Sequence, residues 1–175
     1  LQAFLSDTET PALAARRYLQ HAKAQLAASF HPSAPVSRIL TAGSDVVDAA
    51  LKHLWAEYVG DITGTALIAV GGYGRGELFP QSDVDILVLT RDTADSALSE
   101  RRERFISSLW DTGLQIGHSV RTLAECKTLA ADDLTVVTTM MEARHLSGDQ
   151  TLEPLLKSAT HTSQMWAPDA FIRGK

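Results

Sequence analysis

A glycine-rich segment between two short apolar runs places the strongest constraint on the fold of this 175-residue chain. Residues 66–70 and 86–89 are uninterrupted apolar runs, and their length is typical of buried strands rather than helices. Four glycines lie within six residues directly after the first run: Gly71, Gly72, Gly74 and Gly76. The pattern predicts two neighbouring strands that this segment joins.

The glycine segment is suited to binding a polyphosphate. Glycine permits positive φ angles and lets a ligand approach the backbone N–H groups closely. If residues 75–78 begin a helical turn, their N–H groups and the guanidinium of Arg75 add to the attraction for phosphate. A plain tight turn is the alternative. We predict that five residues bind a nucleotide: Gly71, Gly72, Arg75, Gly76 and Ser82.

Two carboxylates, Asp83 and Asp85, stand where the second apolar run begins. Residues two apart on a strand point to the same face, with Cα atoms about 6.5 to 7 Å apart, so both could reach one divalent ion. Mg²⁺ prefers carboxylate oxygens and keeps positions open for water and phosphate. A polar strand entrance is the alternative. However, Asp85 interrupts an apolar run, where a charge needs a partner. We therefore predict two catalytic Mg²⁺ ligands.

The order of strand, Gly-Gly, ten residues and then Asp-x-Asp resembles the nucleotidyltransferase superfamily that includes DNA polymerase β. Within that superfamily, residues 71–78 and 82–87 look like the PII uridylyltransferase/uridylyl-removing enzymes of bacterial nitrogen regulation. Residues 109–122 and 142–144 are similar to the same family. The likeness extends from about residue 68 to residue 149, and its two separated motifs argue against chance similarity.

The resemblance implies an α/β (α+β) polymerase β-like nucleotidyltransferase domain, with a small mixed sheet, flanking helices and an N-terminal helical layer. It also implies that UMP passes from UTP to a tyrosine of the PII protein, with release of pyrophosphate, in nitrogen and glutamine signalling. Two alternatives stay open. One is an adenylyltransferase of another protein or small molecule, and the other is a non-catalytic nucleotide-binding regulatory module.

A third carboxylate is usual in the wider superfamily, but the strand expected at residues 115–120 contains no Asp or Glu. His118 and Asp133 are the candidates for a third site residue, although Asp133 could equally be the N-cap of the helix that follows it. Tyr73 could stack on a base or pack locally. The third ligand therefore stays unassigned at this point.

Helices are expected where apolar residues recur at helical spacing. In the segment 96–110 we expect Leu98, Phe105 and Leu109 on the inner stripe, and the nearby arginines on the polar side: Arg101, Arg102 and Arg104. The other predicted helices cover residues 11–30, 36–59, 123–131 and 134–146. Gly148 is expected to cap the last of these helices, and residues 152–157 are expected to form a helical patch.

The expected domain organisation is an N-terminal helical segment at 1–60, a catalytic core at 61–150 and a helical extension at 151–175. The chain does not begin with Met, and members of the family are much longer. We therefore expect an excised N-terminal domain of a multifunctional enzyme. The resemblance implies a following HD-type domain and C-terminal ACT domains, so this part should not remove uridylyl groups.

Composition limits the partners. The net charge is −5, from 21 acidic and 16 basic residues, and offers no basic surface for a nucleic acid. No signal peptide or apolar span of membrane length is recognisable, so we expect a cytoplasmic protein without a membrane partner. The single cysteine, Cys126, is expected to be a small buried residue rather than a nucleophile. The spacing of His21, His31 and His53 matches no zinc motif.

Overall fold

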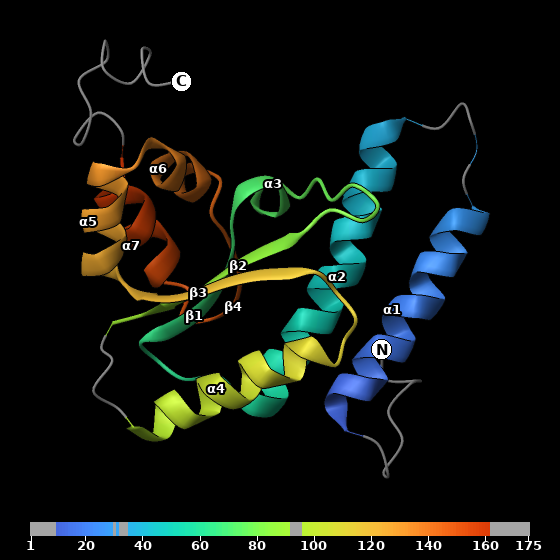
Figure 1. Ribbon diagram of the computed structural model, residues 1–175, viewed down its shortest axis with the longest axis horizontal. Coiled ribbons are helices and arrows are strands. Elements are labelled where there is room, and N and C mark those ends of the chain that lie inside the picture. Colours follow the sequence, from blue (N-terminus) through green and yellow to red (C-terminus); the bar gives the residue numbers. More distant parts are fainter. Residues whose placement is uncertain (1–9, 30, 32–34, 92–95, 162–175) are drawn as a thin grey trace. The chain divides into compact units, whose positions relative to one another are not determined.

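The computed structural model describes residues 10–29, 31, 35–91 and 96–161. Within them the fold is α/β, with one four-stranded sheet in the order β3-β2-β1-β4 (Figure 1). The strands are β1 (Thr65–Ala69), β2 (Val84–Thr90), β3 (Ile116–Thr122) and β4 (Arg144–Gly148). The helices are α1 (Pro11–Ala28), α2 (Val36–Tyr58), α3 (Gly71–Gly74), α4 (Ser96–Trp110), α5 (Leu123–Asp132), α6 (Leu134–Met141) and α7 (Leu152–Ala159). The expected fold class is confirmed.

The chain divides into two compact units, each built from separated stretches of sequence. The first, here called the helical unit, comprises Leu1–Asp61, Gly76–Val84 and Asp95–Gly117. The second, the sheet unit, comprises Ile62–Arg75, Asp85–Ala94 and His118–Lys175. The expected helical extension over 151–175 is described only as far as residue 161, and α7 confirms its helical patch.

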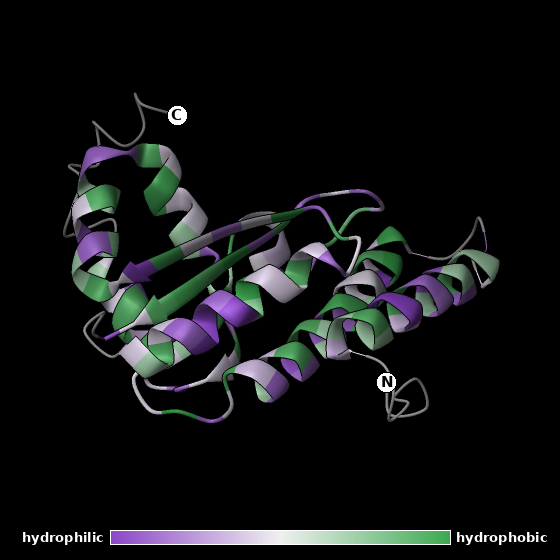
Figure 2. Cartoon of the chain, turned by 60° about the horizontal axis from the view of Figure 1, so that its bottom comes forward, coloured by the Kyte–Doolittle hydropathy of each residue, from purple (hydrophilic) through white to green (hydrophobic). Residues whose placement is uncertain are grey.

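The helical unit is built by helices that carry both hydrophilic and hydrophobic residues along their length (Figure 2). α1 begins after Thr10, whose hydroxyl accepts a hydrogen bond from the N–H of Leu13 at 3.4 Å. α1 packs against α2, and α2 packs against α4. At the contact between α2 and α4 the rings of Trp55 and Phe105 meet edge to face, with their centroids 5.2 Å apart. The predicted helices at 11–30, 36–59 and 96–110 are therefore confirmed over their described residues.

One prediction within α4 is wrong. Leu98, Phe105 and Leu109 are buried as expected, but Arg102 is also buried, at 3% exposure, and its Nη1 atom has no hydrogen-bond partner among the described residues. Residue 102 lies four positions after Leu98 and three before Phe105, so helical geometry places it on the same face as both. Arg101 instead donates a hydrogen bond to the carbonyl of Val59 at 3.2 Å. The polar character of arginine masked this periodicity.

The sheet unit has β1 at its centre. β1 pairs antiparallel with β2 and with β4, and every residue of β1 is buried. Residues of the sheet pack with α5, α6 and α7, which lie together in Figure 1. This core contains Ile68, Leu87, Leu89, Cys126, Ala130, Val137, Met140, Leu152 and Leu156. The two apolar runs of the sequence are therefore neighbouring buried strands, as predicted.

The predicted helix over residues 134–146 is wrong in its second half. α6 ends at Met141, and residues 144–148 form strand β4. The backbone groups of β4 find partners on β1, with Arg144 opposite Ala69, and this distant pairing outweighs a local helical preference. Gly148 is accordingly a strand residue rather than a helix cap. The helical turn considered at residues 75–78 lies earlier in the chain, as α3.

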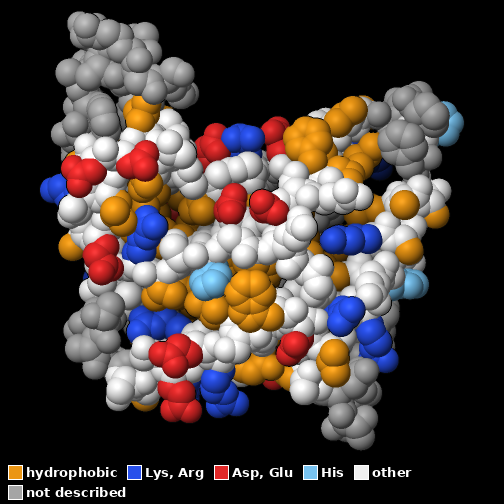
Figure 3. Space-filling view, viewed as in Figure 1, with side chains coloured by type: hydrophobic (Ala, Val, Ile, Leu, Met, Phe, Trp, Pro, Cys, Tyr) orange, Lys and Arg blue, Asp and Glu red, His pale blue; other side chains and the backbone are white. Residues whose placement is uncertain are grey.

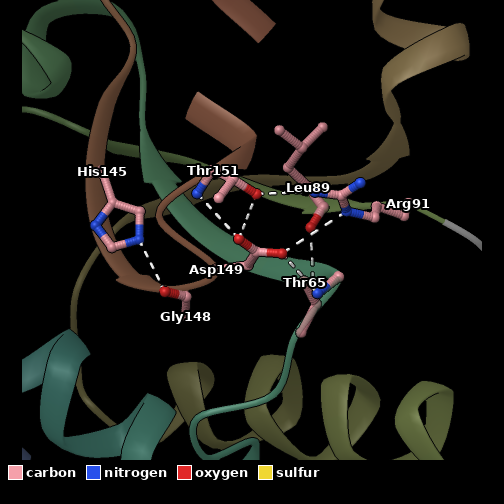
Figure 4. A network of polar contacts seen from close by, with 8 residues as sticks. Thr65, Leu89, Arg91, His145, Gly148, Asp149 and Thr151 are labelled. Carbon is pink, nitrogen blue, oxygen red and sulfur yellow. Dashed lines mark hydrogen bonds and ion pairs between the residues drawn. The ribbon is translucent and has the colours of Figure 1, made fainter. Parts of the chain in front are cut away.

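A polar network surrounds Asp149, just beyond the end of β4 (Figure 4). Its Oδ2 accepts a hydrogen bond from the N–H of Gly64 at 2.8 Å, and its Oδ1 accepts bonds from the N–H and hydroxyl of Thr151 at 2.9 and 2.6 Å. These bonds lower the pKa of Asp149 to about 2, and the bond from the Thr151 hydroxyl contributes most. The Arg91 guanidinium adds to the shift. The network joins the start of β1 to the ends of β2 and β4.

Candidate nucleotidyl-transfer site

The glycine segment begins directly after β1, with the single helical turn α3. The φ angle is 58° at Gly71 and 73° at Gly76, a backbone conformation that residues other than glycine rarely adopt. Two of the glycines predicted to bind a nucleotide are therefore required by backbone geometry. Gly71 belongs to the sheet unit and Gly76 to the helical unit.

Asp85 faces the start of this turn. The N–H of Val70 donates to the carbonyl of Asp85 at 3.1 Å, which joins β2 to the end of β1. The carboxylate atom Oδ2 lies 3.5 Å from the position that a Cβ atom would occupy on Gly71. The Thr139 methyl group on α6 lies 3.7 Å from the same position. The tertiary structure thus brings a predicted metal ligand to a predicted nucleotide-binding glycine.

The end of the turn is held by the segment that joins α6 to β4. Arg75 forms an ion pair with Glu142. Arg144 donates hydrogen bonds to the carbonyls of Gly74 and Tyr73, at 3.2 and 3.3 Å. Its guanidinium also lies 5.4 Å from the centroid of the Tyr73 ring. Tyr73 is 1% exposed, so it packs locally and is not placed to stack on a base.

Ser82 and Asp83 lie in the helical unit, in the loop before β2. The N–H of Ser82 donates to the carbonyl of Phe79 at 3.0 Å, and Gln81 between them has a φ of 68°. Ser82 lines a cavity of about 750 Å³ within this unit, together with Phe79, Gln81 and residues of α1 and α2. Asp83 is exposed directly before the strand. Coordination of one ion by Asp83 and Asp85 remains a prediction.

The two candidates for a third site residue have different surroundings. His118 is exposed on β3. Asp133 is the N-cap of α6, where its side chain accepts a hydrogen bond from the N–H of Thr135 at 2.7 Å. That contact is the alternative that the sequence left open for Asp133. Among the described residues, no three His, Cys, Asp or Glu side chains form a group that could hold a metal ion.

Other expectations about single residues are also resolved. Cys126 is buried, and burial raises its pKa to about 11, so its thiol is protonated at neutral pH. The expectation of a small buried residue is confirmed.

On the face seen in Figure 3, Asp and Glu side chains are interspersed with Lys and Arg. In the part of the chain that the structure describes, no helix has the length and apolar character needed to span a membrane.

Sequence reasoning missed Thr139 and the contacts of Glu142 and Arg144. All three lie about 70 residues from the glycine segment, and nothing in their local pattern indicates that they meet it. The similarity of residues 142–144 to the enzyme family was the available signal, because it marked the segment without stating what it touches.

Comparison with known proteins shows the family of the chain. The family model of the nucleotidyltransferase domain matches residues 50–143, more than half of the chain. The chain therefore belongs to the nucleotidyltransferase domain family.

Similar proteins within this family are bifunctional uridylyltransferase/uridylyl-removing enzymes of bacteria. A bifunctional uridylyltransferase/uridylyl-removing enzyme of Pseudomonas putida (strain W619) is 39% identical over 175 residues, which are 99% of this chain and 19% of the relative. The enzyme of the same description from Ralstonia nicotianae is 51% identical over 143 residues, 82% of this chain and 16% of the relative. The enzyme of Aliivibrio fischeri (strain ATCC 700601 / ES114) is 38% identical over 172 residues, which are 98% of this chain and 20% of the relative. The chain spans about a fifth of the length of these relatives and matches a fragment of them.

One solved structure, described as the crystal structure of the toxin-antitoxin with AMP-PNP, matches 67% of this chain and 86% of its own. Its sequence identity is 22% and its TM-score is 0.39, which is too low to support a conclusion about function.

Proposed function

We propose that this domain transfers UMP from UTP to a tyrosine hydroxyl of the PII nitrogen-regulatory protein. A bond forms between the acceptor oxygen and the α-phosphorus, the bond to the β-phosphate oxygen breaks, and pyrophosphate leaves as the hydroxyl loses its proton. The observation that carries the proposal is the Asp85 carboxylate facing the glycine turn at Gly71. Membership of the family and the similarity to uridylyltransferase/uridylyl-removing enzymes support it.

The residues divide into two sets. Backbone N–H groups of Gly71, Gly72 and Gly76, with Arg75 and Ser82, bind the triphosphate and orient the α-phosphorus for in-line attack. Asp83 and Asp85 would hold Mg²⁺, and the hard oxygens of their carboxylates suit that ion. When bound, Mg²⁺ would stabilise the charge on the phosphates and assist the attacking and leaving oxygens. His118 and Asp133 remain candidates for a third residue.

The wider setting is part of the same proposal. The organisation into an N-terminal helical segment (1–60), a catalytic core (61–150) and an extension (151–175) follows the sequence interpretation. Nitrogen signalling, a cytoplasmic location, and HD-type and ACT domains elsewhere in the whole protein follow from the family resemblance. The relatives are much longer than this chain, which agrees with additional domains.

The test is pyrophosphate release in the presence of Mg²⁺ and PII, with UTP, ATP, CTP and GTP compared, followed by mass analysis of PII. We expect release with UTP only, and UMP on a tyrosine of PII. Release with ATP and an adenylylated acceptor would replace the uridylyl assignment. Nucleotide binding without release from any of the four would favour a regulatory module.

A further inference from the structure

We infer that Glu142 is a positioning residue for nucleotide binding, which holds the guanidinium of Arg75 across the glycine turn. The inference rests on the proposed function, since it assigns Arg75 to the triphosphate. Glu142 itself need not touch the nucleotide. Its role follows from where its backbone is fixed and from what its carboxylate holds.

The backbone of Glu142 is fixed against α3. A Cβ atom on Gly74 would stand only 2.9 Å from the carbonyl carbon of Glu142, and it would collide with the carbonyl oxygen. Two residues later, Arg144 donates hydrogen bonds to the carbonyls of Tyr73 and Gly74. On β4 it also lies opposite Ala69 of β1. The segment from Glu142 to Arg144 therefore packs against the turn as one piece.

The side chain of Arg75 bridges this segment and the turn. Its Nη1 pairs with the Glu142 carboxylate, and its Nη2 lies 3.6 Å from the position of a Cβ on Gly72. The guanidinium thus lies back over the glycines that we assign to the phosphates. It is held there although the side chain of Arg75 is 49% exposed.

Holding this side chain in advance favours ligand binding. A long, exposed arginine loses rotamer freedom when it binds a phosphate, and that loss opposes binding unless the side chain is already ordered. A guanidinium carries five N–H donors, so it can pair with a carboxylate and a phosphate together. The ion pair also offsets the charge of Glu142, which would otherwise repel an anionic ligand.

Glu142→Gln removes the charge while keeping the length of the side chain and the backbone contact with Gly74. The assay is the pyrophosphate release described above, with the nucleotide that the wild-type protein uses, UTP on the proposed function. We expect the nucleotide KM to rise roughly 2- to 10-fold, the effect of releasing one immobilised side chain, with kcat and Tm close to those of the wild type. Glu142→Asp, which restores the charge, should recover part of the loss.

Two comparisons separate positioning from a general loss of stability. Glu153→Gln is the matched control, because it removes the Glu153–Lys157 ion pair on α7 of the same unit; its KM should not change. In an Arg75→Met background, Glu142→Gln should add no further change in KM, since the group it holds is gone.

The outcomes distinguish the inference from the proposed function. An unchanged or lower KM in Glu142→Gln, with normal wild-type transfer, overturns the inference alone. An equal KM increase in the Arg75→Met background also overturns it. A wild-type protein that neither binds nor turns over any of the four nucleotides overturns both.

Discussion

The backbone carbonyl of Glu142 occupies the space that a side chain on Gly74 would need. A Cβ atom there would lie 2.9 Å from the carbonyl carbon of Glu142 and 3.1 Å from the carbonyl oxygen of Ala69. Both neighbours are backbone atoms, Ala69 on β1 and Glu142 between α6 and β4, so neither can move aside without disturbing the sheet unit. Among the glycines of the segment, Gly74 therefore has a packing role in addition to any contact with phosphate.

Gly74→Ala should destabilise the sheet unit, by at least the 1 to 3 kcal/mol that is typical of overpacking. Gly72→Ala is the matched control, because among the described residues its Cβ would meet only the Nη2 atom of Arg75, at an ordinary 3.6 Å. Urea unfolding of both variants measures the difference. Equal stability of the two would contradict the close packing of Gly74 against Glu142.

Asp85→Asn should abolish transfer while the protein stays folded, since it removes a proposed metal ligand without opening a cavity. We expect a fall in kcat of more than about 100-fold, the size found when one group that stabilises transition-state charge is removed. Asp83→Asn should behave in the same way, and Asp45→Asn, on the exposed side of α2, should remain active. Substantial transfer by Asp83→Asn would exclude that residue from the metal site.

Asp149 should make stability fall with acid. Its folded pKa is about 2 and the ordinary value is 3.8, so the unfolded chain takes up the proton first as the pH falls. The stabilisation is complete above about pH 4 and is lost between about pH 4 and pH 2. Asp149→Asn should reduce this acid dependence, measured by urea unfolding between pH 5 and pH 2.5. It should also cost about 1 to 3 kcal/mol at neutral pH, because asparagine has no charge and one acceptor oxygen fewer for the hydrogen bonds from Gly64 and Thr151.

Glu153→Gln serves as the control for that series, because Glu153 lies in the same unit and pairs with Lys157. An acid dependence of Asp149→Asn equal to that of the wild type would mean that other carboxylates cause the loss of stability.

Arg102→Met should leave the free energy of unfolding unchanged or raise it. The guanidinium is buried, and within the part of the chain that the structure describes its Nη1 has no hydrogen-bond partner, which is unfavourable for a buried polar atom. Methionine has a similar length and no polar atom to satisfy. Arg101→Met is the comparison on the same helix, and it should cost about 1 kcal/mol because it loses the hydrogen bond to Val59. A loss above about 1 kcal/mol in Arg102→Met would show that the buried cation stabilises the unit.

Local pattern was a good guide wherever a residue's environment follows from its neighbours in sequence. The apolar runs at 66–70 and 86–89 form β1 and β2, and the segment 96–110, with apolar residues at helical spacing, forms α4. Pattern failed at residues 144–148, where pairing with β1 decides that the backbone is extended. It failed again at Arg102, because residue type was given more weight than the position on the helix.

The family, the buried strands and the residue types of the candidate site could be read from the sequence, because they follow from the local order of apolar residues, glycines and carboxylates. The fold was needed to show that Asp85 faces Gly71, that Glu142 packs on Gly74 and pairs with Arg75, and that Arg144 donates to the carbonyls of α3. The first contact follows from the pairing of β2 with β1, next to Val70 and Asp85. The contacts of Glu142 and Arg144 join residues about 70 positions apart and depend on the pairing of β4 with β1, whose hydrogen bonds no local pattern specifies.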